Sequence, residues 1–459
     1  MRKLAFALVL CLGLILCGCQ KAEPNRDSLP ELETAGTQPS QAPGSFSRTE
    51  TIVIYEELLS GNVLFTLYED GRLVLSGGDI LQSIVDTQAF QDYVKEISII
   101  QIGEGVRVIG EKAFAKADQV KKVILGDSVT TIGYYAFANC AELTQVSFGQ
   151  NVTEIADYAF SGCAKLTDVS LTGQIRHVGG YVFSGCTGLK NAILGSNIQS
   201  LGNCVFDGCT GLTSLRVGCN VSVAALSNNT KLVSLVLEDT VEIIEDRAFS
   251  GCSELQNITL SQNLTTIGDY AFADCTRLKE MVLPQSVTTL GNQVFAGCTA
   301  MVRLEIGTGV TDMGELLVSG CTALKSIVCN SNIGNSSFKD AVGLESVTIG
   351  SQVTVIGQRA FSDCEKLLEV ILPEGVEKVE TRAFYNCKAL RKLSLPRTLK
   401  FVGAEFIYGT EALRTLYYNG SSANWGAVEK EDNWSKNIPG GITWITDFEV
   451  KTKPKDDEG

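Results

Sequence analysis

The chain has 459 residues and a formal net charge of -14, with 44% hydrophobic and 20% charged residues. This acidic balance argues against binding of nucleic acid and against a basic patch held on anionic lipid, because both need clustered Lys and Arg. A chain of this length usually divides into several globular domains, unless it is built from repeats that pack only on their neighbours.

Residues 1–18 have the pattern of an export signal. Arg2 and Lys3 precede an apolar run over residues 4–16, which is too short for an ordinary membrane span. The run leads into Leu-Cys-Gly-Cys, which ends at Cys19 and resembles the bacterial lipobox. The resemblance implies that Cys19 is diacylated and becomes the mature N-terminus. The alternative is an ordinary secretory signal that happens to contain this Cys.

Two non-repetitive segments follow the signal. Residues 19–49 hold four of the nine prolines and few large apolar residues. Such a segment cannot bury enough surface to fold, so we expect a lipidated N-terminus and a disordered tether. Residues 50–96 are expected to form an N-terminal β cap, with a hairpin turn at Asp70-Gly71.

From residue 97 to residue 418 one apolar anchor recurs as the last residue of an L-x-x-V-x-L pattern. Successive anchors are 23 residues apart, except for two steps of 20 residues. This register predicts a solenoid of about 15 turns, in which each unit supplies one short strand with alternate residues buried. The anchors are Ile102, Leu125, Phe148, Leu171, Leu194, Val217, Leu237, Leu260, Leu283, Ile306, Cys329, Ile349, Leu372, Leu395 and Tyr418.

The second half of each unit reads V-x-x-I-G-x-x-A-F-x-x-C, and we expect it to cross back with one helical or 3₁₀ turn. Phe stands eleven residues before the anchor in 11 of 14 units, with Leu226, Val318 and Ile407 in the others. A position so uniformly large and apolar predicts a buried ladder, which we call the Phe slot. Glu replaces the Gly of I-G at Glu245 and Glu380, so this position favours a small residue without demanding a positive φ.

The two 20-residue units, Asn220–Leu237 and Asn330–Ile349, keep the strand and the Phe slot. The three missing residues therefore fall in the crossover. We expect a change of curvature or twist of the solenoid at these two places.

The repeat resembles the BspA-like bacterial leucine-rich-repeat family, because the register, the Phe and the Cys recur together over residues 97–418. The flanks resemble that family too: residues 61–77 look like its N-terminal β cap, and Tyr-Tyr-Asn-Gly at 417–420, followed by Trp425, looks like its closing turn. The resemblance implies an α/β repeat, a leucine-rich-repeat solenoid with a C-terminal cap and charged tail over residues 419–459. It also implies a surface location, roles in adhesion or host interaction, and no common enzymatic activity.

Ten cysteines occupy one slot, eight residues before the anchor, which we call the Cys ladder. Ala, Asn or Thr fills the slot in other units, so we favour buried free thiols over disulfides. A metal site is disfavoured, because thiolate sites need convergent ligands, often with CxxC spacing. The ladder comprises Cys140, Cys163, Cys186, Cys209, Cys252, Cys275, Cys298, Cys321, Cys364 and Cys387.

Little in the chain points to catalysis. His177 is the single histidine, and we interpret it as a surface loop residue. No phosphate-binding or dinucleotide-binding glycine motif is present, and we expect no catalytic residue, cofactor or metal. Three tryptophans near the C-terminus, Trp425, Trp434 and Trp444, favour cap packing over a carbohydrate platform.

The residue before each anchor is expected to point away from the core. Half of these residues are apolar, which fits either β-propensity alone or a ligand face. We predict a membrane-anchored, monomeric cell-surface protein of a bacterium that contacts an extracellular protein or glycan; the alternative is a structural or envelope-assembly scaffold. The candidate ligand face comprises Ile124, Ile193, Arg216, Val236, Val282, Val328, Ile371 and Tyr417.

Overall fold

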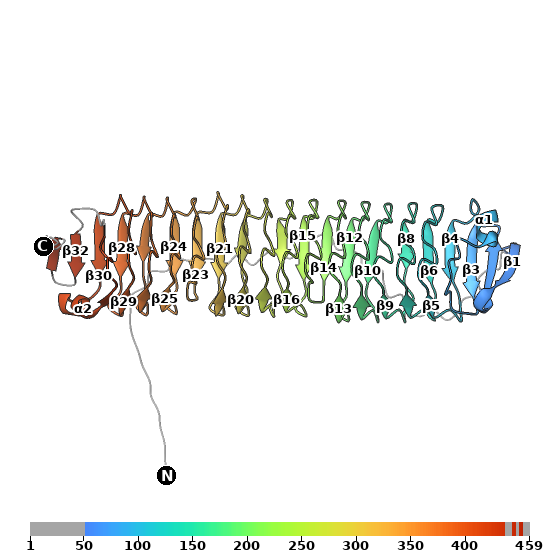
Figure 1. The fold of residues 1–459 in the computed structure, drawn as a ribbon, viewed down its shortest axis with the longest axis horizontal. Coiled ribbons are helices and arrows are strands. Elements are labelled where there is room, and N and C mark those ends of the chain that lie inside the picture. Colours follow the sequence, from blue (N-terminus) through green and yellow to red (C-terminus); the bar gives the residue numbers. More distant parts are fainter. Residues whose placement is uncertain (1–50, 437–442, 447–448, 453–459) are drawn as a thin grey trace, which may run out of the picture. The chain divides into compact units, whose positions relative to one another are not determined.

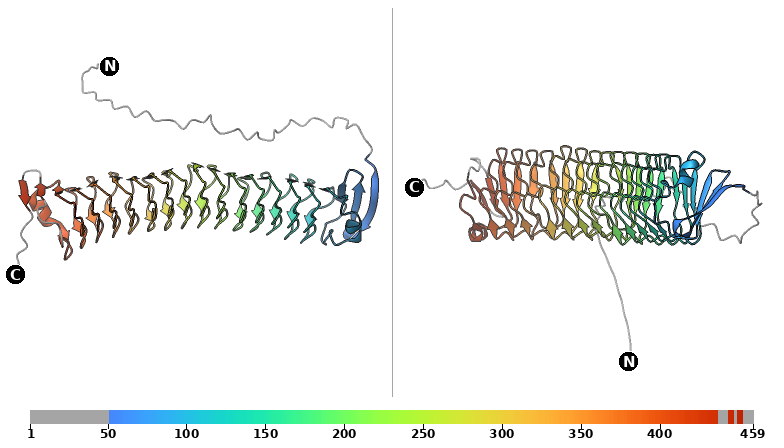
Figure 2. Two further views of the ribbon diagram at one scale, coloured as in Figure 1. Left: turned by 90° about the horizontal axis from the view of Figure 1, so that it is seen from above. Right: turned by 45° about the vertical axis from the view of Figure 1, so that its right-hand side comes forward.

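The computed structural model describes residues 51–436, 443–446 and 449–452, which belong to one compact unit, Thr51–Gly459. The predicted signal segment, the lipid attachment at Cys19 and the tether lie outside the described residues. Within the unit the chain winds as a solenoid, with its repeats stacked side by side (Figure 1). Two further views show the same stack of coils from other sides (Figure 2). No helix in the described ranges is long and apolar enough to cross a membrane.

A β meander opens the solenoid. The strands β2 and β3 pair antiparallel across the Asp70-Gly71 turn, where Gly71 has a φ of 79°. Glycine adopts this backbone without steric cost, so the predicted hairpin is confirmed. β3 pairs in parallel with the first repeat strand. The cap elements are β1 (Val53–Leu59), the 3₁₀ turn η1 (Ser60–Asn62), β2 (Val63–Tyr68), β3 (Arg72–Ser76) and the helix α1 (Gln88–Asp92).

Fifteen short strands form a first row, one for each anchor. Alternate residues are buried, as Val123 and Leu125 are, with Ile124 half-buried between them. The leucine-rich-repeat solenoid of about 15 turns is therefore confirmed. The strands are β4 (Ile99–Ile102), β6 (Lys122–Leu125), β8 (Gln145–Ser147), β10 (Asp168–Leu171), β12 (Asn191–Leu194), β14 (Ser214–Val217), β15 (Ser234–Leu237), β17 (Asn257–Thr259), β19 (Glu280–Val282), β21 (Arg303–Ile306), β23 (Ser326–Cys329), β24 (Ser346–Ile349), β26 (Glu369–Ile371), β28 (Lys392–Leu395) and β30 (Thr415–Tyr418).

A second row of two-residue strands runs along the solenoid, where we expected a helical or 3₁₀ turn (Figure 1). The Gly of I-G follows most of these strands, and none of these glycines has a positive φ, as predicted. Its small size matters, because a Cβ at Gly133 would lie 2.7 Å from the Ile109 carbonyl oxygen. The strands are β5 (Val108–Ile109), β7 (Thr131–Ile132), β9 (Glu154–Ile155), β11 (His177–Val178), β13 (Ser200–Leu201), β16 (Ile243–Ile244), β18 (Thr266–Ile267), β20 (Thr289–Leu290), β22 (Asp312–Met313), β25 (Val355–Ile356), β27 (Lys378–Val379), β29 (Phe401–Val402) and β31 (Glu429–Lys430).

The crossover that follows the second row has a left-handed backbone two residues before and two residues after the Phe slot. Tyr270 (φ 56°) and Asp274 (φ 58°) show both positions around Phe272. Because left-handed residues alternate with ordinary ones, every second backbone N–H points at the next turn. Tyr270 N donates to Asn292 O at 2.9 Å, and Phe272 N donates to Val294 O at 2.9 Å. The crossovers are thus hydrogen-bonded to one another, which satisfies backbone groups that would otherwise be buried without partners.

The Phe slot is a continuous buried ladder, as predicted. Phe272 is 0% exposed, and its ring stacks on Phe249 at 5.3 Å and on Phe295 at 5.9 Å between centroids. Leu226 and Val318, which replace Phe in two units, are also 0% exposed. Each ring therefore contacts only the turns directly before and after it.

All ten thiols of the Cys ladder are buried and free in the structure. Each Sγ donates to the carbonyl of the Phe-slot residue one turn earlier, at 3.1–3.4 Å. Asn229, in the same slot, donates to Phe206 O at 3.2 Å. The slot therefore requires a small side chain, and both Cys and Asn can use it to donate to this carbonyl.

The three missing residues of each short unit fall between the first-row strand and the second row, and not in the crossover that follows, which corrects the prediction. Val221 lies four residues after the anchor Val217, whereas its partner Ile244 lies seven residues after the anchor Leu237. The first row stays in register through them: β14 pairs with β15, and β23 pairs with β24. The second row is interrupted at the same two places and so forms sheets of five, four and four strands. The change of curvature or twist expected at these units stays a prediction.

An Asn or Asp side chain begins each second-row sheet in place of a strand. Asn220 Oδ1 accepts the backbone N–H groups of Glu242 and Ile243 at 2.8 and 3.0 Å. Asn332 and Asp79 make the equivalent pair of hydrogen bonds to the turns that follow them. These hydrogen bonds hold the pKa of Asp79 below its usual value, with the N–H of Arg107 as the largest cause.

Aromatic side chains close the other end of the solenoid. Trp425 lies 5.1 Å from Tyr418, and Trp434 lies 6.5 Å from Phe406, between ring centroids. Trp425 and Trp434 thus pack on the last turn, as cap packing requires; the side chain of Trp444 lies outside the described residues. The closing elements are the helix α2 (Ser422–Ala427) and the strands β31, β32 (Thr443–Thr446) and β33 (Glu449–Thr452).

Candidate functional site

The outward side of the first strand row carries the candidate ligand face. Each of the eight candidates lies between two buried residues and is itself half-buried or exposed. Val282 and Ile371 are the most open apolar side chains among them, at 53% and 57% exposure. The predicted orientation is therefore confirmed for Ile124, Ile193, Arg216, Val236, Val282, Val328, Ile371 and Tyr417.

Three candidates form one contiguous group, which we call the central cluster: Ile193, Arg216 and Val236. They are consecutive Cα partners on β12, β14 and β15. Ser170 and Thr259 continue the row on either side. The central cluster is thus a small apolar surface with one guanidinium at its centre and hydroxyl groups at its borders.

The other candidates are separated by polar neighbours or by breaks in the sheet. First-row pairing is interrupted between β8 and β10 and between β17 and β19, so Ile124 and Val282 lie on different sheets from the central cluster. The face is therefore a set of patches rather than one unbroken stripe. On the sheet that begins with β19, Val282 pairs with Glu305, and Glu305 pairs with Val328. Farther along the same sheet, Ile371 pairs with Ser394, and Ser394 pairs with Tyr417.

Acidic residues neutralise arginines on this face. Arg216 Nε donates to Glu238 Oε1 at 2.6 Å, and Arg303 lies 2.5 Å from Glu305. Exposed ion pairs contribute little to stability, but they fix the direction of a flexible side chain. Glu305 stands before the anchor Ile306 and was expected to face outward, whereas Glu238 follows the anchor Leu237 and so lies outside the positions from which the face was predicted.

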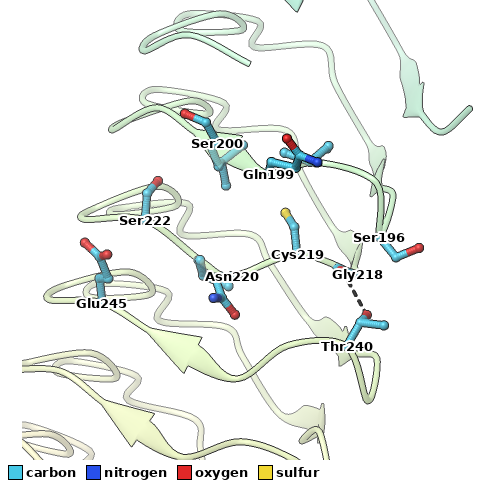
Figure 3. A pocket seen from close by; sticks show the side chains of 12 residues that line it. Ser196, Gln199, Ser200, Gly218, Cys219, Asn220, Ser222, Thr240 and Glu245 are labelled. Carbon is cyan, nitrogen blue, oxygen red and sulfur yellow. Dashed lines mark hydrogen bonds between the residues drawn. The ribbon is translucent and has the colours of Figure 1, made fainter. Parts of the chain in front are cut away.

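A second candidate site opens at the first short unit, on the second-row side. It is a hollow of about 540 Å³, within the range of small-ligand sites. Gln199, Ser200, Asn220, Ser222 and Glu245 surround it, and the ribbon of the shortened turn crosses between them (Figure 3). The sequence predicted the deletion but not the hollow. The hollow exists because the turns on either side of the shortened turn do not fill the space that the missing residues leave.

The edge of β13 forms one wall of this hollow. β13 pairs with β11 alone, through bonds such as Gly202 N to Val178 O at 2.7 Å. In the described chain, the following turn donates no backbone N–H to the carbonyls of Gln199 and Leu201. These two carbonyls are acceptors on a rigid strand that the deletion has left without a neighbour.

Other chemically reactive groups are scattered. His177 is exposed on the strand β11 rather than in a loop, which corrects our interpretation. Cys219 lines the hollow, but burial raises the pKa of its thiol to about 12 and so disfavours the reactive thiolate. Among the described residues no group of three or more His, Cys, Asp or Glu side chains is arranged to hold a metal ion.

Solved structures that are similar to this chain include proteins from several bacteria. A leucine-rich repeat protein from Bacteroides ovatus has a TM-score of 0.59 and 24% identity, covering 85% of this chain and 100% of that one. A leucine-rich repeat protein from Eubacterium ventriosum has a TM-score of 0.40 and 23% identity, covering 79% and 95%. A leucine rich cell surface protein from Faecalibacterium prausnitzii has a TM-score of 0.29 and 20% identity, covering 82% and 98%. The first of these likenesses concerns the fold alone.

The repeats themselves match a family model. No curated protein matches the chain. The model described as "BspA type Leucine rich repeat region (6 copies)" matches residues 83–213, 220–339 and 331–426, which is more than half of the chain. The Phe slot, the Cys ladder and the register described above are the features of these matched residues, and the chain belongs to the BspA-type leucine-rich repeat family.

Proposed function

We propose that this chain is a cell-surface binding protein that holds a protein partner against the first strand row, centred on the central cluster. The observation that carries the proposal is the side-by-side placement of Ile193, Arg216 and Val236 on one rigid sheet. Apolar area beside a fixed guanidinium is typical of protein interfaces. A rigid surface also avoids the ordering cost that flexible loops bring to association.

The family is typically non-enzymatic, and binding rather than catalysis accounts for how the chain is built. Burial fixes the Phe slot, and burial with hydrogen bonding to a backbone carbonyl fixes the ten thiols of the Cys ladder. The outward first-row positions are free of that constraint, so they can differ from turn to turn to suit a ligand. A spacer or scaffold in the envelope is the rival function, and it needs no such cluster.

To test the proposal, Ile193, Arg216 and Val236 are changed together to Ser in residues 51–459, the compact unit described above. Surface changes usually cost under about 0.5 kcal/mol each, so the variant should fold. Its affinity for a partner captured by the parent from envelope and host extracts should fall at least about 30-fold, the size of one strong interface residue. The matched control changes Val282 and Ile371 to Ser, which lie on another sheet.

A folded triple variant that binds as tightly as the parent would place the site elsewhere. Selective capture of peptidoglycan or another envelope component, unchanged in the triple variant, would favour the scaffold.

We further propose that the chain is exported and held at the membrane by lipid on Cys19. Two acyl chains give stable anchoring, whereas one does not. Changing Cys19 to Ser should leave unprocessed precursor and abolish incorporation of labelled fatty acid, with Cys17→Ser as the control. Labelling that persists in the Cys19 variant would contradict the anchor.

A further inference from the structure

A cleft adjoins the hollow at the first short unit. It has a volume of about 240 Å³, and its lining includes Tyr134, Glu154, Asp157 and His177. Ser200 lines both the cleft and the hollow, so the two lie next to each other along the second row. The turn that holds Glu245 comes five turns after the one that holds Tyr134, which is a distance of about 24 Å at the usual spacing of parallel strands. We call this combined surface the second-row groove.

An aromatic side chain stands at one end of the groove. Tyr134 is 39% exposed, and its ring packs edge-to-face on Tyr135 at 4.3 Å and on Tyr158 at 5.9 Å. Tyr135, Tyr158 and Tyr181 stack on one another at 4.8 and 4.9 Å, which gives Tyr134 a fixed support. An exposed, supported ring can pack against an apolar C–H face of a ligand without losing conformational freedom.

The rest of the groove is rich in hydrogen-bond acceptors and lacks cationic side chains. Neither the hollow nor the cleft has Lys or Arg in its lining. In the described residues Glu154, Asp157 and Glu245 form no ion pair. Together with the open carbonyls of β13, these carboxylates suit a ligand with many hydroxyl or amino donors. The same carboxylates repel an anionic ligand, because like charges at close range repel each other.

We propose that the second-row groove binds an oligosaccharide that is neutral or carries amino groups. A sugar chain combines C–H faces, which pack on Tyr134, with hydroxyl groups, which donate to carboxylates and backbone carbonyls. An extended peptide suits the groove less well, because β13 offers an edge of only two residues. This site is separate from the central cluster, which lies on the first row.

The second short unit provides an internal comparison. It has the same deletion, and Asn332 begins its new sheet as Asn220 does. Asp269 stands there at the position of Asp157, but four other side chains of the groove have no like counterpart, so the deletion alone does not supply the ligand chemistry. At the positions of Tyr134, Glu154, His177 and Glu245 it has Asp246, Thr266, Thr289 and Gly357.

Calorimetry on residues 51–459 tests the groove with four probes: cellotetraose, chitotetraose, de-N-acetylated chitotetraose and acidic tetragalacturonate. At least one of the first three should bind with a Kd below about 1 mM, and tetragalacturonate should not. Tyr134→Ala should weaken binding about tenfold or more, and Glu245→Gln should weaken the amino probe most. Gln358→Ala, at the register position of Tyr134 in a distant turn, is the matched control and should change nothing.

The central-cluster triple variant should bind the sugar as the parent does, which separates this proposal from the proposed protein-binding function. Thermal melting of each variant verifies that it is folded. The proposal is overturned if none of the three non-acidic probes binds, if tetragalacturonate binds as tightly, or if folded Tyr134→Ala keeps the parent's affinity.

Discussion

Changing Phe272 to Ala is expected to lower the free energy of unfolding by about 3–5 kcal/mol, because it removes a fully buried ring and leaves a cavity. The ring is 0% exposed and stacks on Phe249 and Phe295, so both neighbouring turns lose contact area. Each unit packs only on its neighbours, and damage in the middle should therefore split thermal unfolding into two transitions. Differential scanning calorimetry measures both effects.

Phe272→Leu is the matched control, because Leu226 fills the same slot in another turn without exposure. A change of this kind keeps most of the volume and should cost less than about 1.5 kcal/mol. An Ala variant that melts like the parent would mean that the ladder does not hold the turns together.

A steep loss of stability above pH 9 is the second expected result, and it comes from the Cys ladder. Burial is the largest cause that raises the pKa of Cys209 and of Cys252 from the ordinary 9.0 to about 12. The unfolded chain therefore loses these protons near pH 9 while the folded chain keeps them. Stability from these thiols is fully present below pH 9 and is lost as the pH rises toward 12, at up to about 1.4 kcal/mol per thiol per pH unit.

Cys209→Ala combined with Cys252→Ala isolates this effect. At pH 7 the double variant should be less stable than the parent, because it loses two buried donors to backbone carbonyls. Between pH 9 and 11 its stability should fall less steeply, since two titrating thiols are gone. Denaturant unfolding at a series of pH values under reducing conditions measures the slope, and identical slopes for the two proteins would contradict buried, protonated thiols.

Periodicity allowed the repeat architecture to be predicted well. The anchors, the Phe slot and the Cys slot recur at one spacing, so burial of Leu125 or Phe272 follows from register alone. The Glu residues that replace the I-G glycine showed that a positive φ is not required there. The outward orientation of the central cluster followed from the alternation along a strand.

Features that depend on neighbouring turns were not predictable in the same way. The second row escaped notice because a two-residue strand has no periodicity of its own. The hollow at the first short unit arises from how Asn220 and its neighbours leave the edge of β13 open, which no single unit reveals. One signal was available: Asn220 and Asn332 each precede a Val or Ile in a short unit, as Asp79 precedes Ile80 at the first turn.

Hydroxyl-radical footprinting of residues 51–459, with and without the captured protein partner, tests the central claim most directly. The account predicts that binding lowers the oxidation of Ile193 and Val236 on the first row. Phe272 should stay unoxidised in both states, because it is buried. Unchanged oxidation of Ile193 and Val236, with protection confined to Trp425 and Trp434 at the closing end, would contradict binding through the strand face.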